Sequence, residues 1–161
     1  MRFDAEVSAA VSAARRVYGI SVDPALVHAV IQKETGHTAP AAGTPEPGGR
    51  FSYGPMQVLD STARLHGIED PATLLVPSLG IRIGTYELAR LLKKFGGSVA
   101  RALAGYNAGP GYGDAVLAFW RKYRGQLGGA LAGSAAGLVG GGLALLLVTA
   151  LMTARRRRRA A

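Results

Sequence analysis

Three short polar segments hold the residue types in this sequence that could carry chemistry. They are Glu34-Thr35, Gly54-Pro55-Met56-Gln57 and Tyr106-Asn107-Ala108-Gly109. Each lies at or beside an expected helix end, and converging helix ends form a groove. Such a groove would offer one carboxylic acid, several amide groups and an aromatic face, which are the groups that a sugar ring needs for hydrogen bonding and stacking.

Glu34 is the candidate proton donor because it ends an almost wholly apolar helix expected over residues 25–36. Asp23 is a suitable N-cap, Pro24 suits the first helical position and Gly36 suits the end. A helix that is apolar on most sides is buried in a core, so burial should raise the pKa of Glu34. A carboxyl that keeps its proton near neutral pH can protonate a leaving-group oxygen. The alternative is an ordinary solvated glutamate in a last helical turn.

Other kinds of site are not indicated. His28, His37 and His66 lack the spacing of metal ligands, and His28 is more simply explained as a hydrogen-bonded helix residue. The sequence contains no phosphate-binding loop, dinucleotide fingerprint or nucleophile elbow. We therefore expect neither a metal nor a cofactor. Because cysteine is absent, redox chemistry does not indicate the compartment.

The elements that must position these segments are short helices, so residues 1–124 are predicted to form one small all-α domain. Residues 1–18 carry an amphipathic stripe. Further helices should be capped by Asp60 or Ser61, by Ser78 and by Ser98, and a short turn should start at Asp70-Pro71. Residues 37–52 are rich in proline and glycine and are expected to be a loop, either a binding flap or a surface insertion. A short hairpin near this loop is left open.

A second region, residues 125–154, is predicted to contain a transmembrane helix. No charged residue occurs between Arg124 and Arg155, a gap longer than the roughly 20 residues needed to cross a bilayer. Glycines spaced four apart would share one helix face and allow self-association. These glycines are Gly129, Gly133, Gly137 and Gly141. The alternative is a flexible linker over residues 128–133, with the span starting near Ala135.

The basic tail, residues 155–161, follows the predicted span directly. Its run from Arg155 to Arg159 predicts the cytoplasmic side of a membrane, or the equivalent face of a virion membrane. The net charge is +9, and removing these five arginines leaves +4 for the rest of the chain. A mildly basic domain suits an anionic polymer such as cell wall, nucleic acid or anionic lipid. Because the arginines lie directly after the predicted span, a topology signal or contact with anionic lipid is favoured for them. No specific nucleic acid is expected as a partner.

The order of the three polar segments resembles the soluble lytic transglycosylase (SLT) family, whose fold is lysozyme-like. That family has Glu-Ser, then Gly-Leu-Met-Gln, then Ala-Tyr-Asn-Ala-Gly, and the resemblance here covers residues 24–111. This chain departs from the pattern at Thr35, Pro55 and Gly105, and in the composition of the 37–52 segment. The first substitution keeps the hydroxyl group.

The resemblance implies that the substrate is peptidoglycan and that the bond cut joins N-acetylmuramic acid to N-acetylglucosamine. Glu34 would protonate the glycosidic oxygen and then accept a proton from the muramyl 6-hydroxyl, giving a 1,6-anhydro product. The substrate's own acetamido group would take the place of a second carboxylate. The implied substrate-binding residues are Gln57, Tyr106, Asn107, Met56 and Thr35, with Tyr53 and Tyr86 as weaker candidates.

Several functions remain in competition at this point. The first is a membrane-anchored lytic transglycosylase with a single C-terminal span, and its variant is a hydrolytic lysozyme of the same fold. The others are an inactive wall-binding structural protein and a genome-packaging protein that relies on the arginine run. The export signal of a secreted protein is not expected, because Phe3, Asp4 and Glu6 interrupt the first residues. A bacteriophage virion or lysis protein is the expected setting, with the bacterial cell envelope as the alternative.

Overall fold

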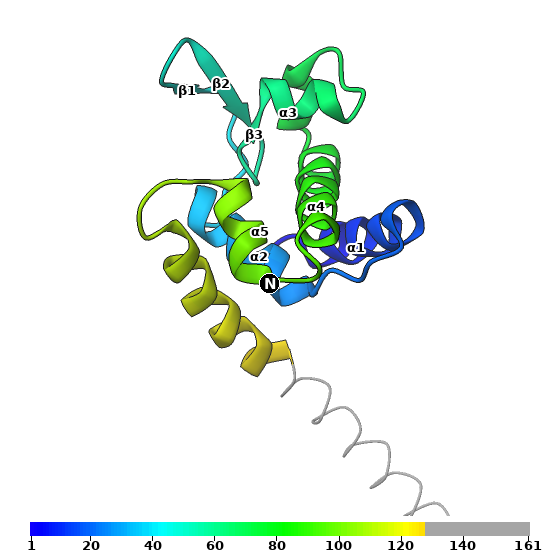
Figure 1. Cartoon of the computed structure of the whole chain (residues 1–161). Helices are drawn as coiled ribbons and strands as arrows, with labels where there is room; N and C mark the ends of the chain where they lie inside the picture. The colour runs from blue at the N-terminus through cyan, green and yellow to red at the C-terminus, as the bar shows by residue number, and fades with distance from the viewer. Residues whose placement is uncertain (128–161) are drawn as a thin grey trace, which may run out of the picture. The chain divides into compact units, whose positions relative to one another are not determined.

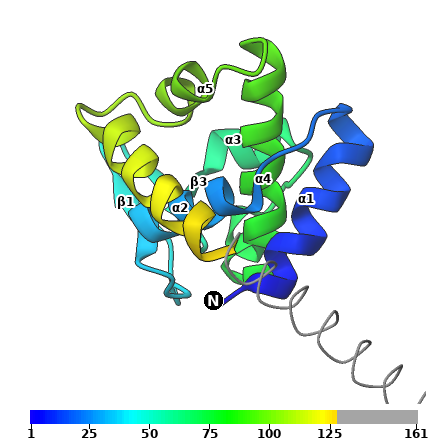
Figure 2. The same cartoon turned by 90° about the horizontal axis from the view of Figure 1, so that it is seen from below.

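The computed structural model describes residues 1–127. Residues Met1–Tyr123 form one compact unit, in which α1 and α4 lie side by side (Figures 1 and 2). The predicted transmembrane helix, its glycine face and the arginine tail lie outside the described residues. Within residues 1–127, no helix combines the length and the apolar character needed to cross a bilayer.

Helices α1 (Asp4–Tyr18) and α2 (Pro24–Thr35) form as the sequence predicts. The Asp23 carboxylate accepts a hydrogen bond of 2.9 Å from the Ala25 N–H, which caps the start of α2. Gly36 ends α2 in the left-handed region at φ 59°, where a residue without a side chain is favoured. Every residue from 25 to 31 is buried, so α2 is a core helix that delivers its last turn to the surface.

A three-stranded antiparallel sheet interrupts the helices, in the order β1 (Thr44–Glu46), β2 (Arg50–Tyr53), β3 (Val58–Leu59). The expectation of a loop over residues 37–52 is therefore wrong for β1 and β2, and the short hairpin is what forms. Gly48 and Gly49 turn the chain between these two strands with φ of 79° and 71°. The strands are short and mostly exposed, so they show no alternation that a sequence pattern could reveal.

The remaining helices follow the sheet along the chain. They are α3 (Asp60–Leu65), the 3₁₀ helix η1 (Pro71–Leu75), α4 (Pro77–Lys94), α5 (Val99–Tyr106) and a helix that includes residues 112–127. The short turn predicted to start at Asp70-Pro71 and the predicted cap Ser98 are confirmed. The predicted caps at Ser78 and at Asp60 or Ser61 are wrong, because α4 already begins at Pro77 and Asp60 lies inside the first turn of α3. The mainly helical class is confirmed.

Close glycine contacts fix the turn that holds the second polar segment. A side chain at Gly84 of α4 would place its Cβ only 2.6 Å from the Met56 Cβ, so the methionine packs directly on the helix backbone. Gly54 has φ 72°, and a Cβ there would lie 2.2 Å from the Leu74 carbonyl oxygen. Both positions need glycine, which anchors residues 54–57 against α4 and η1.

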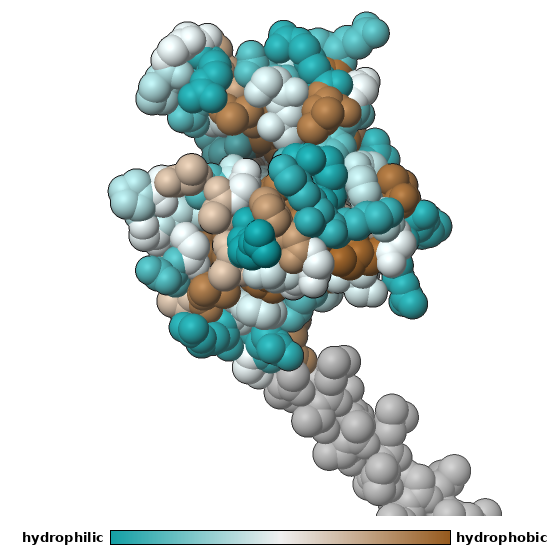
Figure 3. Space-filling model, in the orientation of Figure 1, coloured by the Kyte–Doolittle hydropathy of each residue, from teal (hydrophilic) through white to brown (hydrophobic). Residues whose placement is uncertain are grey.

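The surface of the domain is mainly polar. On the face shown in Figure 3, hydrophilic side chains surround small, separate apolar areas. Among the described residues, the large apolar side chains that are most exposed are those of Val17, Leu65 and Val76. Scattered apolar residues of this kind are normal for a protein surface.

Candidate active site

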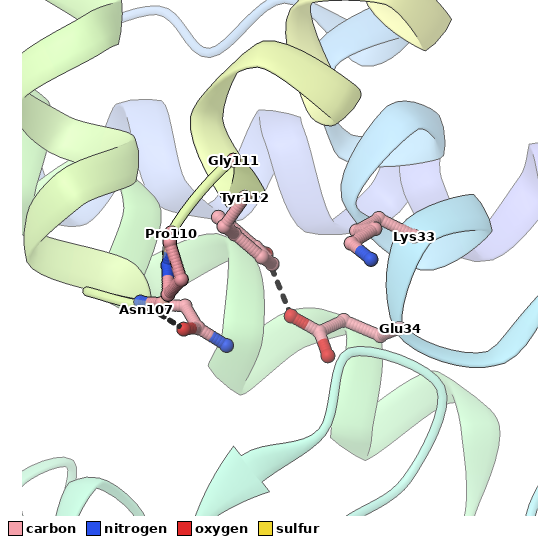
Figure 4. A pocket seen from close by; sticks show the side chains of 7 residues that line it. Lys33, Glu34, Asn107, Pro110, Gly111 and Tyr112 are labelled. Carbon is pink, nitrogen blue, oxygen red and sulfur yellow. Dashed lines mark hydrogen bonds between the residues drawn. The ribbon is translucent and has the colours of Figure 1, made fainter.

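Glu34 lies in a surface pocket of about 280 Å³ between the last turn of α2 and the chain that follows α5 (Figure 4). The residues that line the pocket come from these two stretches. They are Lys33, Glu34, Asn107, Gly109, Pro110, Gly111 and Tyr112. The first and third polar segments of the sequence therefore meet in one pocket.

Tyr112 holds the Glu34 carboxyl. Its hydroxyl donates a hydrogen bond of 2.6 Å to Glu34 Oε1, and the tyrosine is only 4% exposed. The other carboxyl oxygen points away from Tyr112 (Figure 4). One oxygen is thus oriented by a neutral donor, and the other is left to carry a proton.

Burial raises the pKa of Glu34 above its ordinary value, which confirms the predicted direction. Two groups oppose this effect by stabilising the ionised carboxylate, namely the Tyr112 hydrogen bond and then the positive charge of Lys33. The negative charge of Glu46 raises the pKa slightly further. Glu34 therefore keeps its proton to a higher pH than a solvated glutamate, yet has partners ready for its ionised form.

Hydrogen bonds to the backbone tie the second polar segment to the other two. The Thr35 hydroxyl lies 3.0 Å from the Pro55 carbonyl oxygen and can donate to it, which joins the end of α2 to the turn. The Tyr106 hydroxyl donates to the Met56 carbonyl oxygen at 2.9 Å, which joins α5 to the same turn. Burial raises the pKa of Tyr106 well above its usual range, so it stays a neutral donor. Hydrogen bonds thus connect the three segments, although no residue of the second segment lines the pocket.

Gln57 is held within its own turn. Its side-chain Nε2 donates to the Gly54 carbonyl oxygen at 2.9 Å, and its Oε1 lies 2.8 Å from the Ser52 hydroxyl. Ser52 Oγ is also 2.8 Å from Glu46 Oε1. A hydroxyl carries one proton, so Ser52 donates to one of these two oxygens at a time. The backbone of Gln57 is left-handed, at φ 45°.

The other predicted site residues lie in different places. Asn107 lines the pocket, with its Oδ1 accepting from the Gly109 N–H at 2.8 Å and its amide nitrogen directed toward the side of Glu34 (Figure 4). Met56 is fully buried. Tyr53 is the last residue of β2, where its ring lies against Phe51 and Gly43, and Tyr86 packs edge-on against Tyr18. Neither lines the pocket.

Sequence reasoning missed Tyr112 and gave Lys33 no role. Tyr112 is separated from Glu34 by 78 positions in the chain, so no local pattern joins them. The available signal was an aromatic residue placed directly after the Gly109-Pro110-Gly111 turn, which follows the third motif. A tyrosine at such a turn can be directed back toward the motif.

Comparison with known proteins identifies the family and the fold of the domain. A family model described as "Transglycosylase SLT domain" matches residues 12–128. An inactive mutant of the lytic transglycosylase Slt from Pseudomonas aeruginosa superposes with a TM-score of 0.58 and 22% identity, covering 79% of this chain and 25% of that one. The 70 kDa soluble lytic transglycosylase from Escherichia coli has a TM-score of 0.58 and 23% identity, covering 73% and 24%.

This chain spans about a quarter of the length of each of these two proteins, and at such identities the likeness shows the fold. The family model covers most of the chain, including all three polar segments and Tyr112. The chain therefore belongs to the transglycosylase SLT domain family, with a mainly helical, lysozyme-like domain.

Proposed function

We propose that this protein is a peptidoglycan lytic transglycosylase. It cleaves the β-1,4 bond between N-acetylmuramic acid and N-acetylglucosamine and leaves a 1,6-anhydro end. The observation that carries the proposal is the Glu34 carboxyl in a pocket formed with the third family motif, with its pKa raised by burial and one oxygen held by Tyr112. Membership of the family supplies the substrate class.

In the first step, protonated Glu34 donates its proton to the glycosidic oxygen as the bond from that oxygen to the muramyl C1 breaks. Because Tyr112 occupies Oε1, the proton is carried by the other oxygen. Positive charge develops at C1 in an oxocarbenium-like transition state, and the substrate's acetamido oxygen stabilises it. Glu34 is then ionised, and the Tyr112 hydroxyl and the Lys33 charge stabilise the carboxylate.

In the second step, the muramyl 6-hydroxyl attacks C1, and its proton passes to the Glu34 carboxylate. One C–O bond has broken, one has formed, and the acid has regained its proton, so no water is consumed. Asn107 is the side-chain amide in the pocket, and we assign it to the acetamido group. Gln57 supports the site from the neighbouring turn, where Ser52 and Gly54 hold its amide.

The test is digestion of purified peptidoglycan by the wild-type chain and by Glu34→Gln, followed by mass spectrometry of the released fragments. We expect anhydro ends from the wild type, lighter than reducing ends by one water molecule. The variant should bind the wall without releasing fragments, since glutamine can still accept from Tyr112 but cannot donate a carboxyl proton. Reducing ends would instead identify a hydrolytic lysozyme, and lysis by the variant would remove Glu34 as the acid.

We further propose that a membrane span within residues 125–154 tethers the domain, and that the protein acts as a bacteriophage virion or lysis component. Support comes from the uncharged stretch between Arg124 and Arg155 and from the arginines that follow it. Alkaline extraction of membranes should leave the full chain in the pellet and release a chain ending at residue 124. Immunodetection in purified particles, compared with the host membrane, tests the virion setting.

A further inference from the structure

Lys33 supplies the positive charge at the wall of the Glu34 pocket. It is the cationic residue among those that line the pocket, and it is exposed in the last turn of α2. In Figure 4 its side chain extends toward the same space as Glu34 and Tyr112. In the proposed reaction this charge stabilises ionised Glu34, and Glu34 is ionised in only part of the reaction cycle.

Among the ion pairs found in residues 1–127, none includes Lys33. The carboxylates that form them are those of Asp4, Asp60 and Glu87. The charge of Lys33 acts on Glu34, and it outweighs the opposite effect of Glu46, which does not line the pocket. The positive charge of Lys33 is therefore offset by the Glu34 carboxyl, through space, only when that carboxyl is ionised.

This coupling gives the pocket a different charge in its two states. Substrate must bind while Glu34 is protonated and neutral, because that is the form that can donate a proton. In that state the Lys33 ammonium has no counter-charge among the lining residues, which are otherwise neutral side chains and backbone. A positive charge beside a polar pocket favours a substrate that brings its own anion.

We propose that Lys33 selects glycan strands that carry a free carboxylate on the muramyl side chain next to the scissile bond. This inference rests on the proposed function and specifies the substrate feature that the site reads. Neutral N-acetylglucosamine polymers, and strands whose carboxylates are blocked, lack the anion that would pair with Lys33. As Glu34 ionises, the positive charge of Lys33 then stabilises the Glu34 carboxylate.

The experiment compares two substrates of equal length for each variant. One is peptide-free glycan with the muramyl carboxylates intact, and the other is the same material with the carboxylates converted to methylamides. We expect the wild type to show a kcat/KM about fivefold higher on the charged strands at low salt, the upper range for an exposed ion pair. Lys33→Met should bring the ratio to about one, and Lys33→Arg should keep it.

Lys93→Met is the matched control, because Lys93 is also exposed and lies in the last turn of its helix, α4. Like Lys33→Met, it removes a positive charge from the last turn of a helix, where such a charge is favourable. The ratio of kcat/KM on the two substrates should therefore equal that of the wild type. Thermal unfolding of each variant checks that the fold is kept. Any effect of Lys33 on the pKa of Glu34 acts on both substrates equally and cancels in the ratio.

The outcomes separate this inference from the proposed function. A wild-type chain that cleaves both substrates equally overturns the role of Lys33 and leaves the transglycosylase activity standing. The same conclusion follows if Lys33→Met keeps the wild-type ratio. A wild-type chain that cleaves neither substrate, and does not release fragments from whole peptidoglycan, contradicts the proposed function itself.

Discussion

Replacing Tyr112 with phenylalanine removes the hydroxyl that donates to Glu34 and keeps the buried ring. A hydrogen bond to a charged group contributes about 1.5–3 kcal/mol, and one to a neutral group about 0.5–1.5 kcal/mol. The bond therefore favours ionised over protonated Glu34 by about 1–1.5 kcal/mol, which corresponds to about one pKa unit. Without it, the pKa of Glu34 should rise by about one further unit.

The assay is the pH dependence of kcat/KM on soluble glycan strands. The fall of kcat/KM on the alkaline side of this profile reports ionisation of Glu34 in the free enzyme. In Tyr112→Phe this alkaline limb should therefore move upward by about one pH unit. Because one pKa unit corresponds to a tenfold change in acid strength, the maximum rate should fall by no more than about tenfold. Chemical shifts of the Glu34 carboxyl carbon, measured across the same pH range, give the pKa without reference to activity.

Tyr123→Phe is the matched control for this prediction. Tyr123 lies on the same helix as Tyr112, and its hydroxyl donates to another α2 side chain, that of Gln32, at 2.9 Å. This control should leave the alkaline limb in place. The reasoning is refuted if Tyr112→Phe leaves the carboxyl pKa unchanged or lowers it, because the hydroxyl would then not be supporting the ionised form of Glu34.

Two further predictions concern stability. Burial disfavours the ionised form of Glu87, but hydrogen bonds, led by that from Arg90, outweigh it and lower its pKa to about 2. Ionised Glu87 therefore stabilises the fold above its ordinary pKa, and this stabilisation is lost as the pH falls. In urea unfolding, the free energy of unfolding of the wild type should fall by up to about 3 kcal/mol between about pH 5 and pH 2. Glu87→Gln should not show this fall. Gly84→Ala should reduce stability by about 1–3 kcal/mol by contact with Met56. Gly113→Ala, in a helix with open space around it, should be neutral or stabilising in the same measurement.

Local chemistry let the sequence predict most of the helical framework. The start of α2, for example, depends on Asp23 and Pro24 and its end depends on Gly36, and each acts within a few residues along the chain. The burial of α2 follows from its apolar composition, and the raised pKa of Glu34 follows from that burial. The motif order was equally visible, because residue types and their spacing are properties of the chain itself.

Predictions failed where the neighbouring residues in the sequence gave a weak signal or none. The strands β1 and β2 are too short and exposed to show a period, so the sequence favoured a loop and left pairing across the Gly48-Gly49 turn open. Ser78 has the side chain of a cap, yet α4 starts one residue earlier at Pro77, whose ring fixes a helical φ.

The sequence alone determined that a carboxyl would stand at the mouth of a buried helix, in a chain with the motifs of one family. Only the tertiary structure decided what surrounds that carboxyl. Tyr112 reaches Glu34 across 78 positions, and Tyr106 reaches the Met56 carbonyl across 50. Such contacts depend on how whole helices pack, and packing is a collective property of the core that no short window of residues contains.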